Sequence, residues 1–224
     1  MSVAGRLVII AGATSSSGVA AARELKGAGA RVIAVGRNPH KLAALAELGV
    51  QTLACDLTDE SAVVELSQRV RYADGPVDGV LHLVGGWLGG GGLAGQSDED
   101  FRFLEASFTA LRHVSRAFNA DLCASPAGRL AVVSSTAVAR PLAGGANYAA
   151  VKAATEAWAR AVAQGFAKDA RDAGREVSAA SVIFRVQSLA GLENELAQRF
   201  ADLWKAPADE INDTIVELNE IGHT

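Results

Sequence analysis

The chain has 224 residues, half of them hydrophobic, and a formal net charge of −4 at pH 7. This length fits one large α/β domain with a sizeable core. An acidic balance without any basic run argues against binding to nucleic acid or to an anionic membrane, because both need clustered positive charge. The sequence starts directly in an apolar strand, and no apolar run approaches about 18 residues. We therefore expect a soluble, cytoplasmic protein.

The spacing of cysteines and histidines in the sequence gives little support for a metal site or a disulfide. The two cysteines, Cys55 and Cys123, lie far apart and belong to no CxxC motif. Neither a disulfide framework nor a zinc site is expected from such spacing. The four histidines are scattered through predicted helix, strand, helix and tail: His40, His82, His113 and His223. We expect no metal site.

Apolar strand patterns alternate with helical patterns along most of the chain. Uninterrupted apolar runs are typical of parallel strands that are covered on both faces. The predicted strands are Arg6–Ala11, Arg31–Val35, Gln51–Ala54, Gly79–Leu83, Arg129–Ser134 and Ser178–Phe184. The predicted helices are Ser17–Gly27, Pro39–Leu48, Asp59–Tyr72, Asp98–Ala124 and Asn147–Ala173. This alternation predicts a three-layer, Rossmann-type doubly wound parallel sheet of about seven strands, as a single domain over residues 1–224.

The end of the chain is less regular. Residues 207–211 read as a short helical turn, and Asn212 with Asp213 reads as a turn. The β-branched run from Thr214 to Leu218 then predicts a last strand. A continuous helix over this region is the competing interpretation.

A turn of small residues follows the first predicted strand. Such a turn lets backbone amides approach a pyrophosphate at the N-terminus of the next helix, which predicts a dinucleotide cradle. Ser16 stands where a glycine would be usual, and a tight turn without a ligand is the alternative. The residues expected to contact the cofactor here are Gly12, Thr14, Ser15, Ser16, Ser17 and Gly18.

Two positions at the ends of the next strands bear on cofactor choice. Arg37 follows the second strand, where an acidic residue would bind a ribose 2′-hydroxyl and repel a 2′-phosphate. Arg37 thus favours NADP(H) over NAD(H), unless it is only an exposed arginine at a strand end. Asp56, which precedes Leu57 after the third strand, is expected to accept from an adenine amino group, to cap the next helix, or to do both.

Tyr148, Lys152 and Ser135 form a candidate proton-transfer site. A tyrosine four residues before a lysine shares its helix face. A nearby ammonium favours the phenolate, lowering a pKa that is about 10 in water. Ser135, at the end of a strand, is placed to hold the substrate oxygen that gains or loses the proton. Taken alone, a Tyr–Lys pair at this spacing also occurs on many solvated helices.

Together, these motifs resemble the short-chain dehydrogenase/reductase family over nearly the whole chain. The resemblance rests on the order and spacing of five features: the turn from Gly12 to Gly18, Asp56-Leu57, Gly85-Gly86, Ser135, and Tyr148 with Lys152. It implies that Tyr148 is the catalytic acid/base and that Lys152 lowers its pKa and holds the nicotinamide ribose. Ser135 would bind the substrate oxygen.

The chain also departs from the family pattern at three places. Leu83-Val84-Gly85-Gly86 replaces the usual Asn-Asn-Ala-Gly, so cofactor contact at Val84, Gly85 and Gly86 is expected through the backbone. Ser107 occupies the position of an asparagine that anchors a water in the proton relay. The Pro-Gly turn expected after the sixth strand is absent, with Ile183–Val186 in its place.

Two segments are candidates for the substrate side. Residues 85–97, the glycine-rich loop, form a possible lid whose Trp87 and Leu88 would cover an apolar substrate; a loop without contacts is the alternative. Residues 186–206 carry no motif and are assigned to the substrate side. Arg140-Pro141-Leu142 is expected to line the pocket. In the resembling family, the helices matching 98–124 and 147–173 build oligomers, which implies a homodimer or homotetramer.

The resemblance implies an NADP(H)-dependent oxidoreductase that interconverts a carbonyl and an alcohol on a small molecule. Two alternatives stay open. One is a catalytically weak or inactive dinucleotide-binding sensor or scaffold of the same fold, which the three departures motivate. The other is an enzyme that uses NAD(H).

Overall fold

Seven apolar segments pair side by side in the computed structural model, which describes residues 2–219. All the pairings are parallel, and the strand order is β3-β2-β1-β4-β5-β6-β7. The order reverses between β1 and β4, and ligands of open α/β sheets bind at the carboxyl edge of such a point. The strands are β1 (Leu7–Ala11), β2 (Arg31–Gly36), β3 (Gln51–Ala54), β4 (Gly79–His82), β5 (Gly128–Ser135), β6 (Ala179–Val186) and β7 (Thr214–Glu217).

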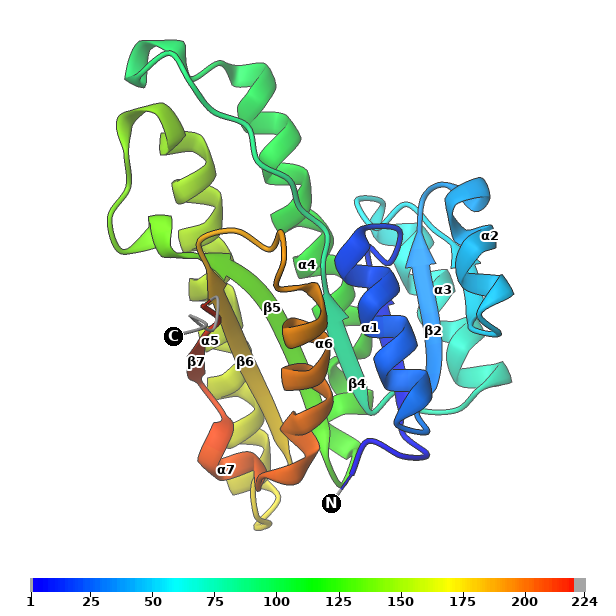
Figure 1. Cartoon of the computed structure of the whole chain (residues 1–224). Helices are drawn as coiled ribbons and strands as arrows, with labels where there is room; N and C mark the ends of the chain where they lie inside the picture. The colour runs from blue at the N-terminus through cyan, green and yellow to red at the C-terminus, as the bar shows by residue number, and fades with distance from the viewer. Residues whose placement is uncertain (1, 220–224) are drawn as a thin grey trace, which may run out of the picture.

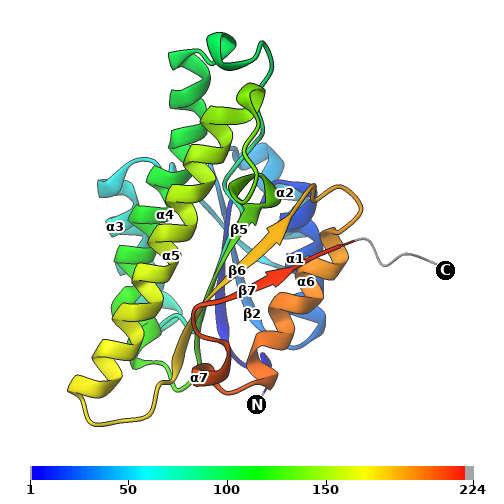
Figure 2. The ribbon, with the colours of Figure 1, turned by 90° about the vertical axis from the view of Figure 1, so that its left-hand side faces the viewer.

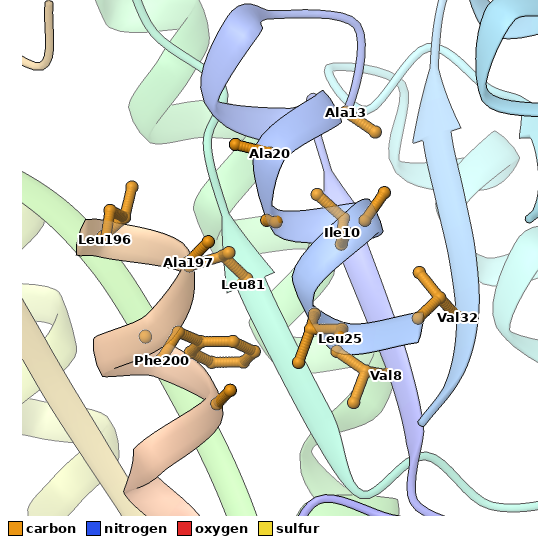
Figure 3. Close-up of a cluster of buried hydrophobic side chains, with 14 of the residues drawn as sticks. Val8, Ile10, Ala13, Ala20, Leu25, Val32, Leu81, Leu196, Ala197 and Phe200 are labelled. Atoms are coloured by element: carbon orange, nitrogen blue, oxygen red, sulfur yellow. The ribbon is translucent and has the colours of Figure 1, made fainter. Parts of the chain in front are cut away.

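Side chains of the central strands alternate between hydrophobic cores on the two faces of the sheet. Along β1, Leu7 and Ile9 point to one core, whereas Val8 and Ile10 point to the other. Figure 3 shows the second of these, where Leu25 and Phe200 pack on the sheet. Helices cover both faces (Figure 1): α1 (Ser16–Gly27), α2 (Pro39–Glu47) and α6 (Glu193–Asp202) on one, α3 (Glu60–Ala73), α4 (Asp98–Ala124) and α5 (Ala146–Asp172) on the other.

Side-chain caps position most of the helix starts around the site. Ser15 accepts a hydrogen bond from the Gly18 amide at the start of α1, and Ser97 accepts from Asp100 at the start of α4. Such caps satisfy amides that have no partner within the helix. Helix α5 differs, because its N-cap residue is Gly145, which has no side chain to accept with.

The predicted fold class is confirmed, and most element bounds agree within two residues. The last segment is the strand β7, paired with β6 after the short helix α7 (Ala208–Ile211), so the competing helix is excluded there. Helix α6 was not predicted. Its Leu196, Ala197 and Phe200 are buried, and it packs beside α1. Within residues 2–219, none of the helices combines the length and apolar character needed to cross a membrane.

The N-terminal ends of α4 and α5 rise beyond the carboxyl edge of the sheet (Figures 1 and 2). The glycine-rich loop leads into α4 and contains the 3-10 turn η1 (Leu93–Gly95). The segment before α5 contains the 3-10 turn η3 (Ala143–Gly145), and η1 and η3 are in contact. These two segments therefore lie together beyond the carboxyl edge of the sheet, where the candidate site lies.

Candidate active site

The turn between β1 and α1 brings backbone against backbone. Gly12 has φ +84°, and a Cβ there would lie 2.7 Å from the Val84 nitrogen. A Cβ on Gly18 would lie 2.2 Å from the Ala13 carbonyl oxygen. Only glycine fits at either position, so the turn keeps its backbone free of side chains at the start of α1. This geometry fits the pyrophosphate of a dinucleotide.

Serines complete this turn. Ser15 caps α1 through its side chain, and Ser17 is buried. The Ser16 hydroxyl donates to Glu193 Oε1 over 3.3 Å, so the residue that replaces the usual glycine connects the turn to α6. Thr14 packs near Gly36, where an added Cβ would lie 3.0 Å from Thr14 Cγ2.

Arg37 and Asp56 lie at the carboxyl ends of neighbouring strands. Arg37 is exposed just after β2. Asp56 accepts from the Thr58 hydroxyl at 2.7 Å and from the Thr58 amide at 3.0 Å. Those hydrogen bonds, and to a lesser extent the charge of Arg37, hold the pKa of Asp56 below its ordinary value. Asp59, not Asp56, caps α3 by accepting from Ala62; Leu57 is buried between them.

Ser135, Tyr148 and Lys152 come together as the sequence predicted. Ser135 ends β5, and Tyr148 and Lys152 lie on successive turns of α5, which packs on β5. Lys152 is buried, and its Nζ donates to the Val133 carbonyl at 2.8 Å. The same Nζ lies over the Tyr148 ring, 5.7 Å from its centroid. Helix packing thus places an ammonium, a phenol and a hydroxyl at one point of the carboxyl edge.

Burial dominates the proton affinities of these groups. It raises the pKa of the Tyr148 phenol above its ordinary value, against the lowering effect of a hydrogen bond with Ser135. Burial also lowers the pKa of Lys152 to about 8. The direction for Tyr148 is opposite to that expected from the sequence, because burial desolvates the phenol. At neutral pH the tyrosine holds its proton in this structure.

Ser107 lies on α4 beside the end of β4. Its hydroxyl donates to the Leu104 carbonyl at 2.6 Å, within its own helix. Its backbone carbonyl is 3.1 Å from Nε2 of the buried His82, and a carbonyl only accepts, so Nε2 carries the proton. Nδ1 of His82 is then a buried acceptor without a protein partner among residues 2–219. Burial lowers the pKa of His82 to about 4, and the charge of Lys152 acts in the same direction.

The segment after β4 approaches the cradle through its backbone. The Val84 amide lies against Gly12, since a Cβ on that glycine would come within 2.7 Å of the amide nitrogen. Gly85 lies beside the lysine, because a Cβ on it would be 3.7 Å from Lys152 Nζ. A Cβ on Gly86 would lie 3.2 Å from the Phe103 ring. Backbone contact with a cofactor is thus geometrically open at Val84 and Gly85.

An ion pair occupies the place of the absent Pro-Gly turn. Residues 183–186 lie inside β6, which pairs with β5 as far as Ser135 and Val186. Arg185 donates to Glu156 through Nε at 3.1 Å and through a terminal nitrogen at 2.8 Å. Ser134 donates to the same carboxylate at 2.7 Å. Glu156 is buried one turn after Lys152, so this network fixes α5 to β5 and β6 directly behind the site.

The glycine-rich loop is hydrogen-bonded to the segment before α5. The Gly90 amide donates to the Gly144 carbonyl at 2.7 Å, and the Gln96 side chain bonds to both segments. Trp87 and Leu142, on these segments, are 65% and 72% exposed and leave apolar surface free at the rim. On the opposite side, the connection from β6 to α6 consists of residues 187–192 alone.

Comparisons with known proteins agree with this geometry. The family model described as short chain dehydrogenase matches residues 6–171. The 2,3-dihydro-2,3-dihydroxybenzoate dehydrogenase of Bacillus subtilis is 32% identical over 162 residues, which are 68% of this chain and 60% of that enzyme. The chain belongs to the short-chain dehydrogenase family. It spans less than two thirds of that relative's length.

Two solved structures show the same fold. A metagenomic short-chain oxidoreductase in complex with NADP is 24% identical, with a TM-score of 0.82, over 98% of this chain and 100% of its own. L-Sorbose reductase from Gluconobacter frateurii, complexed with NADPH and L-sorbose, is 19% identical, with a TM-score of 0.82, over 98% of this chain and 97% of its own.

The sequence did not predict several residues that lie at the site. Glu156 follows Lys152 by four positions, so helical spacing alone could have indicated it. His82 is one of the scattered histidines, without a motif around it. Gln96 and Glu193 give no local signal, because their partners are distant in the sequence. Within residues 2–219 no cluster of three or more potential metal-ligating side chains forms.

Proposed function

We propose that this protein is an NADP(H)-dependent oxidoreductase that interconverts a carbonyl and an alcohol on a small molecule. The observation that carries the proposal is the convergence of Tyr148, Ser135 and Lys152 beside a glycine turn that a Cβ would block. NADP(H), when bound, supplies or accepts the hydride. The turn from Gly12 to Gly18 would hold its pyrophosphate, and Lys152 its nicotinamide ribose.

In this proposal the protein's own residues handle the proton. Tyr148 donates to the substrate oxygen during reduction, or removes the hydroxyl proton during oxidation, and Ser135 holds that oxygen by a hydrogen bond. The raised pKa of Tyr148 keeps the phenol protonated at neutral pH, so that it can donate its proton during reduction. Ser107 remains the proposed relay position, with its hydroxyl oxygen free to accept from water.

The test uses both tyrosines of the chain. Tyr148→Phe should abolish NADPH oxidation with any accepted ketone, in a panel of cyclohexanone, ethyl acetoacetate and L-sorbose. The affinity for NADPH, measured by fluorescence titration, should stay within about threefold, because the phenol contributes one hydrogen bond at most. Tyr72→Phe is the matched control, since Tyr72 is 95% exposed on α3 and should change nothing. Unchanged turnover in Tyr148→Phe would defeat the assignment.

The preference for NADP(H) rests on Arg37. Its guanidinium is exposed at the end of β2, and its charge reaches Asp56 at the end of β3. A cation there suits a 2′-phosphate. Titrating the wild type and Arg37→Asp with NADPH and NADH tests this, and the substitution should reverse the preference. Tighter binding of NADH by the wild type would overturn it and identify an NAD(H) enzyme.

The remaining parts of the proposal concern substrate and assembly. Residues 85–97 and 186–206 would border the substrate, with Leu142 at the rim. Helices α4 and α5 would mediate a homodimer or homotetramer, as the family resemblance implies; light scattering in solution tests this. Tight NADPH binding without turnover of any panel ketone would instead favour a dinucleotide-binding sensor or scaffold.

A further inference from the structure

We propose that Gln96 is a positioning residue, which joins the glycine-rich loop to the N-terminus of the catalytic helix α5 and thereby sets the shape of the substrate entrance. Its effect on turnover rests on the proposed function, whereas its effect on the two backbones does not. Gln96 is half-buried and directly precedes the N-cap of α4. Its side chain makes contacts in two directions.

The amide nitrogen of Gln96 holds the loops together. Nε2 lies 3.0 Å from the Gly90 carbonyl, 3.2 Å from that of Gly92 and 3.1 Å from that of Gly144. Gly90 itself donates to Gly144, and a Cβ on Gly89 would lie 2.5 Å from the Gly144 oxygen. The two backbones therefore approach so closely that only glycine fits at position 89. The side-chain amide of Gln96 bridges carbonyls of both segments, and the Gly144 carbonyl accepts from the Gly90 amide as well.

The amide oxygen of Gln96 caps the catalytic helix. The first amides of an α-helix have no intrahelical partner and usually bond to a side chain at the N-cap. The N-cap of α5 is Gly145, which makes no side-chain bond. Gln96 Oε1 accepts from the Asn147 amide at 3.2 Å, and Asn147 Nδ2 donates to the Ser97 carbonyl at 3.1 Å. A residue about fifty positions away thus supplies the missing cap.

This cap lies next to the reacting group. Tyr148 follows Asn147 directly, in the first turn of α5, so fraying of that turn displaces the phenol. The loop held by Nε2 carries Trp87, and the segment before α5 carries Leu142, the two exposed apolar side chains at the rim. Gln96 therefore couples the placement of the proton donor to the spacing of the rim. Its two functional groups can be separated by substitution.

Two variants separate the roles. Gln96→Glu keeps an oxygen for the Asn147 amide, where a negative charge also suits the helix N-terminus, but loses every donor to the loop. Gln96→Leu removes both the donor to the loop and the acceptor for the Asn147 amide, and its side chain is similar in size to that of glutamine. Gln51→Leu is the matched control, because Gln51 is an exposed glutamine on β3 whose Nε2 donates to Asp74 far from the site.

Hydrogen–deuterium exchange followed by mass spectrometry gives the readout that needs no substrate. In both Gln96 variants, the Gly90 amide should exchange at least about tenfold faster, because its bond to the Gly144 carbonyl is no longer supported by Gln96 Nε2. Amides in the first turn of α5 should exchange faster only in Gln96→Leu. NADPH affinity should stay within about twofold in both, since the cradle is formed by other segments. Gln51→Leu should match the wild type throughout.

Kinetics with the panel ketone that the wild type reduces fastest complete the test. Gln96→Glu should raise KM about fivefold with kcat within about twofold, whereas Gln96→Leu should also lower kcat by about fivefold or more. The proposal is overturned if Gln96→Leu leaves exchange in both segments at the wild-type rate, or if the two variants behave alike at α5. Absence of turnover in the wild type contradicts the proposed function alone, and the exchange pattern then decides on Gln96.

Discussion

The Ser16 hydroxyl donates a hydrogen bond to Glu193 Oε1, joining the turn after β1 to the first turn of α6. The second oxygen, Oε2, accepts from the Gly191 amide at 2.9 Å. A carboxylate is thus held beside the N-terminus of α1, where the anionic pyrophosphate is proposed to bind. A ligand of like charge must displace or tolerate it.

Glu193→Gln should therefore tighten NADPH binding by about twofold to fivefold, because pairs of partly exposed charges are worth about 0.2–1 kcal/mol. Fluorescence titration at low and high salt measures this, and salt should shrink the difference. Glu195→Gln, on the same turn but paired with Arg199, is the control. Equal affinities of Glu193→Gln and wild type would rule out interference by this carboxylate.

The buried charge of Lys152 should lower the free energy of unfolding of the protein in the absence of ligand. Its pKa is about 8 in the folded chain, below the value in the unfolded chain, so the unfolded state binds more protons between pH 8 and about 10.4. Stability of the wild type therefore rises with pH across this window. At pH 7, Lys152→Met should unfold at a higher urea concentration than the wild type, with a free energy of unfolding that is larger by at most about 3 kcal/mol. This difference in free energy should vanish near pH 10.5. A variant less stable than wild type at pH 7 would contradict this.

His82 should make the protein sensitive to acid. Its pKa of about 4 lies below the ordinary 6.5, so the unfolded chain takes up the proton first as pH falls. The contribution of His82 is present above pH 6.5 and is lost towards pH 4, by at most about 3 kcal/mol. His82→Gln keeps a donor for the Ser107 carbonyl and should show a flatter profile. Urea unfolding at several pH values measures this. If the free energy of unfolding depended on pH in the same way in the wild type and in His82→Gln, His82 would not be a buried neutral histidine.

Two glycines of α1 should respond in opposite ways to alanine. Gly18→Ala should destabilise the fold by about 1–3 kcal/mol and weaken NADPH binding, since its Cβ would meet the Ala13 backbone at 2.2 Å. The Cβ added by Gly27→Ala would have no atom within 4 Å. This substitution should leave the free energy of unfolding unchanged or raise it by up to about 1 kcal/mol. Chemical unfolding followed by circular dichroism distinguishes them. A Gly18→Ala variant as stable as Gly27→Ala would contradict the prediction and show that the contact at Gly18 is relieved by a backbone shift.

The sequence predicted those parts of the fold whose signal is local. Strands such as β1 are short apolar runs, and Tyr148 and Lys152 share a helix face by spacing alone. Helix α6 was missed although Leu196 and Phe200 are four apart, because Leu192 at its N-cap gives no capping bond. The contacts of Gln96 and the orientation of Lys152 over the tyrosine ring depend on how distant segments pack, which no local pattern records.

The continuation of β6 to Val186 leaves six residues, 187–192, to reach α6. Three of their amides are already bonded: Ala190 to the Ser188 hydroxyl, Gly191 to Glu193, and Leu192 to the Leu189 carbonyl. Ordering a residue costs about 1–2 kcal/mol of conformational entropy, and here most of that cost is met during folding. A substrate that bound on this side, as proposed, would meet backbone already held by these hydrogen bonds, and selectivity would then depend on how well its shape matches that backbone.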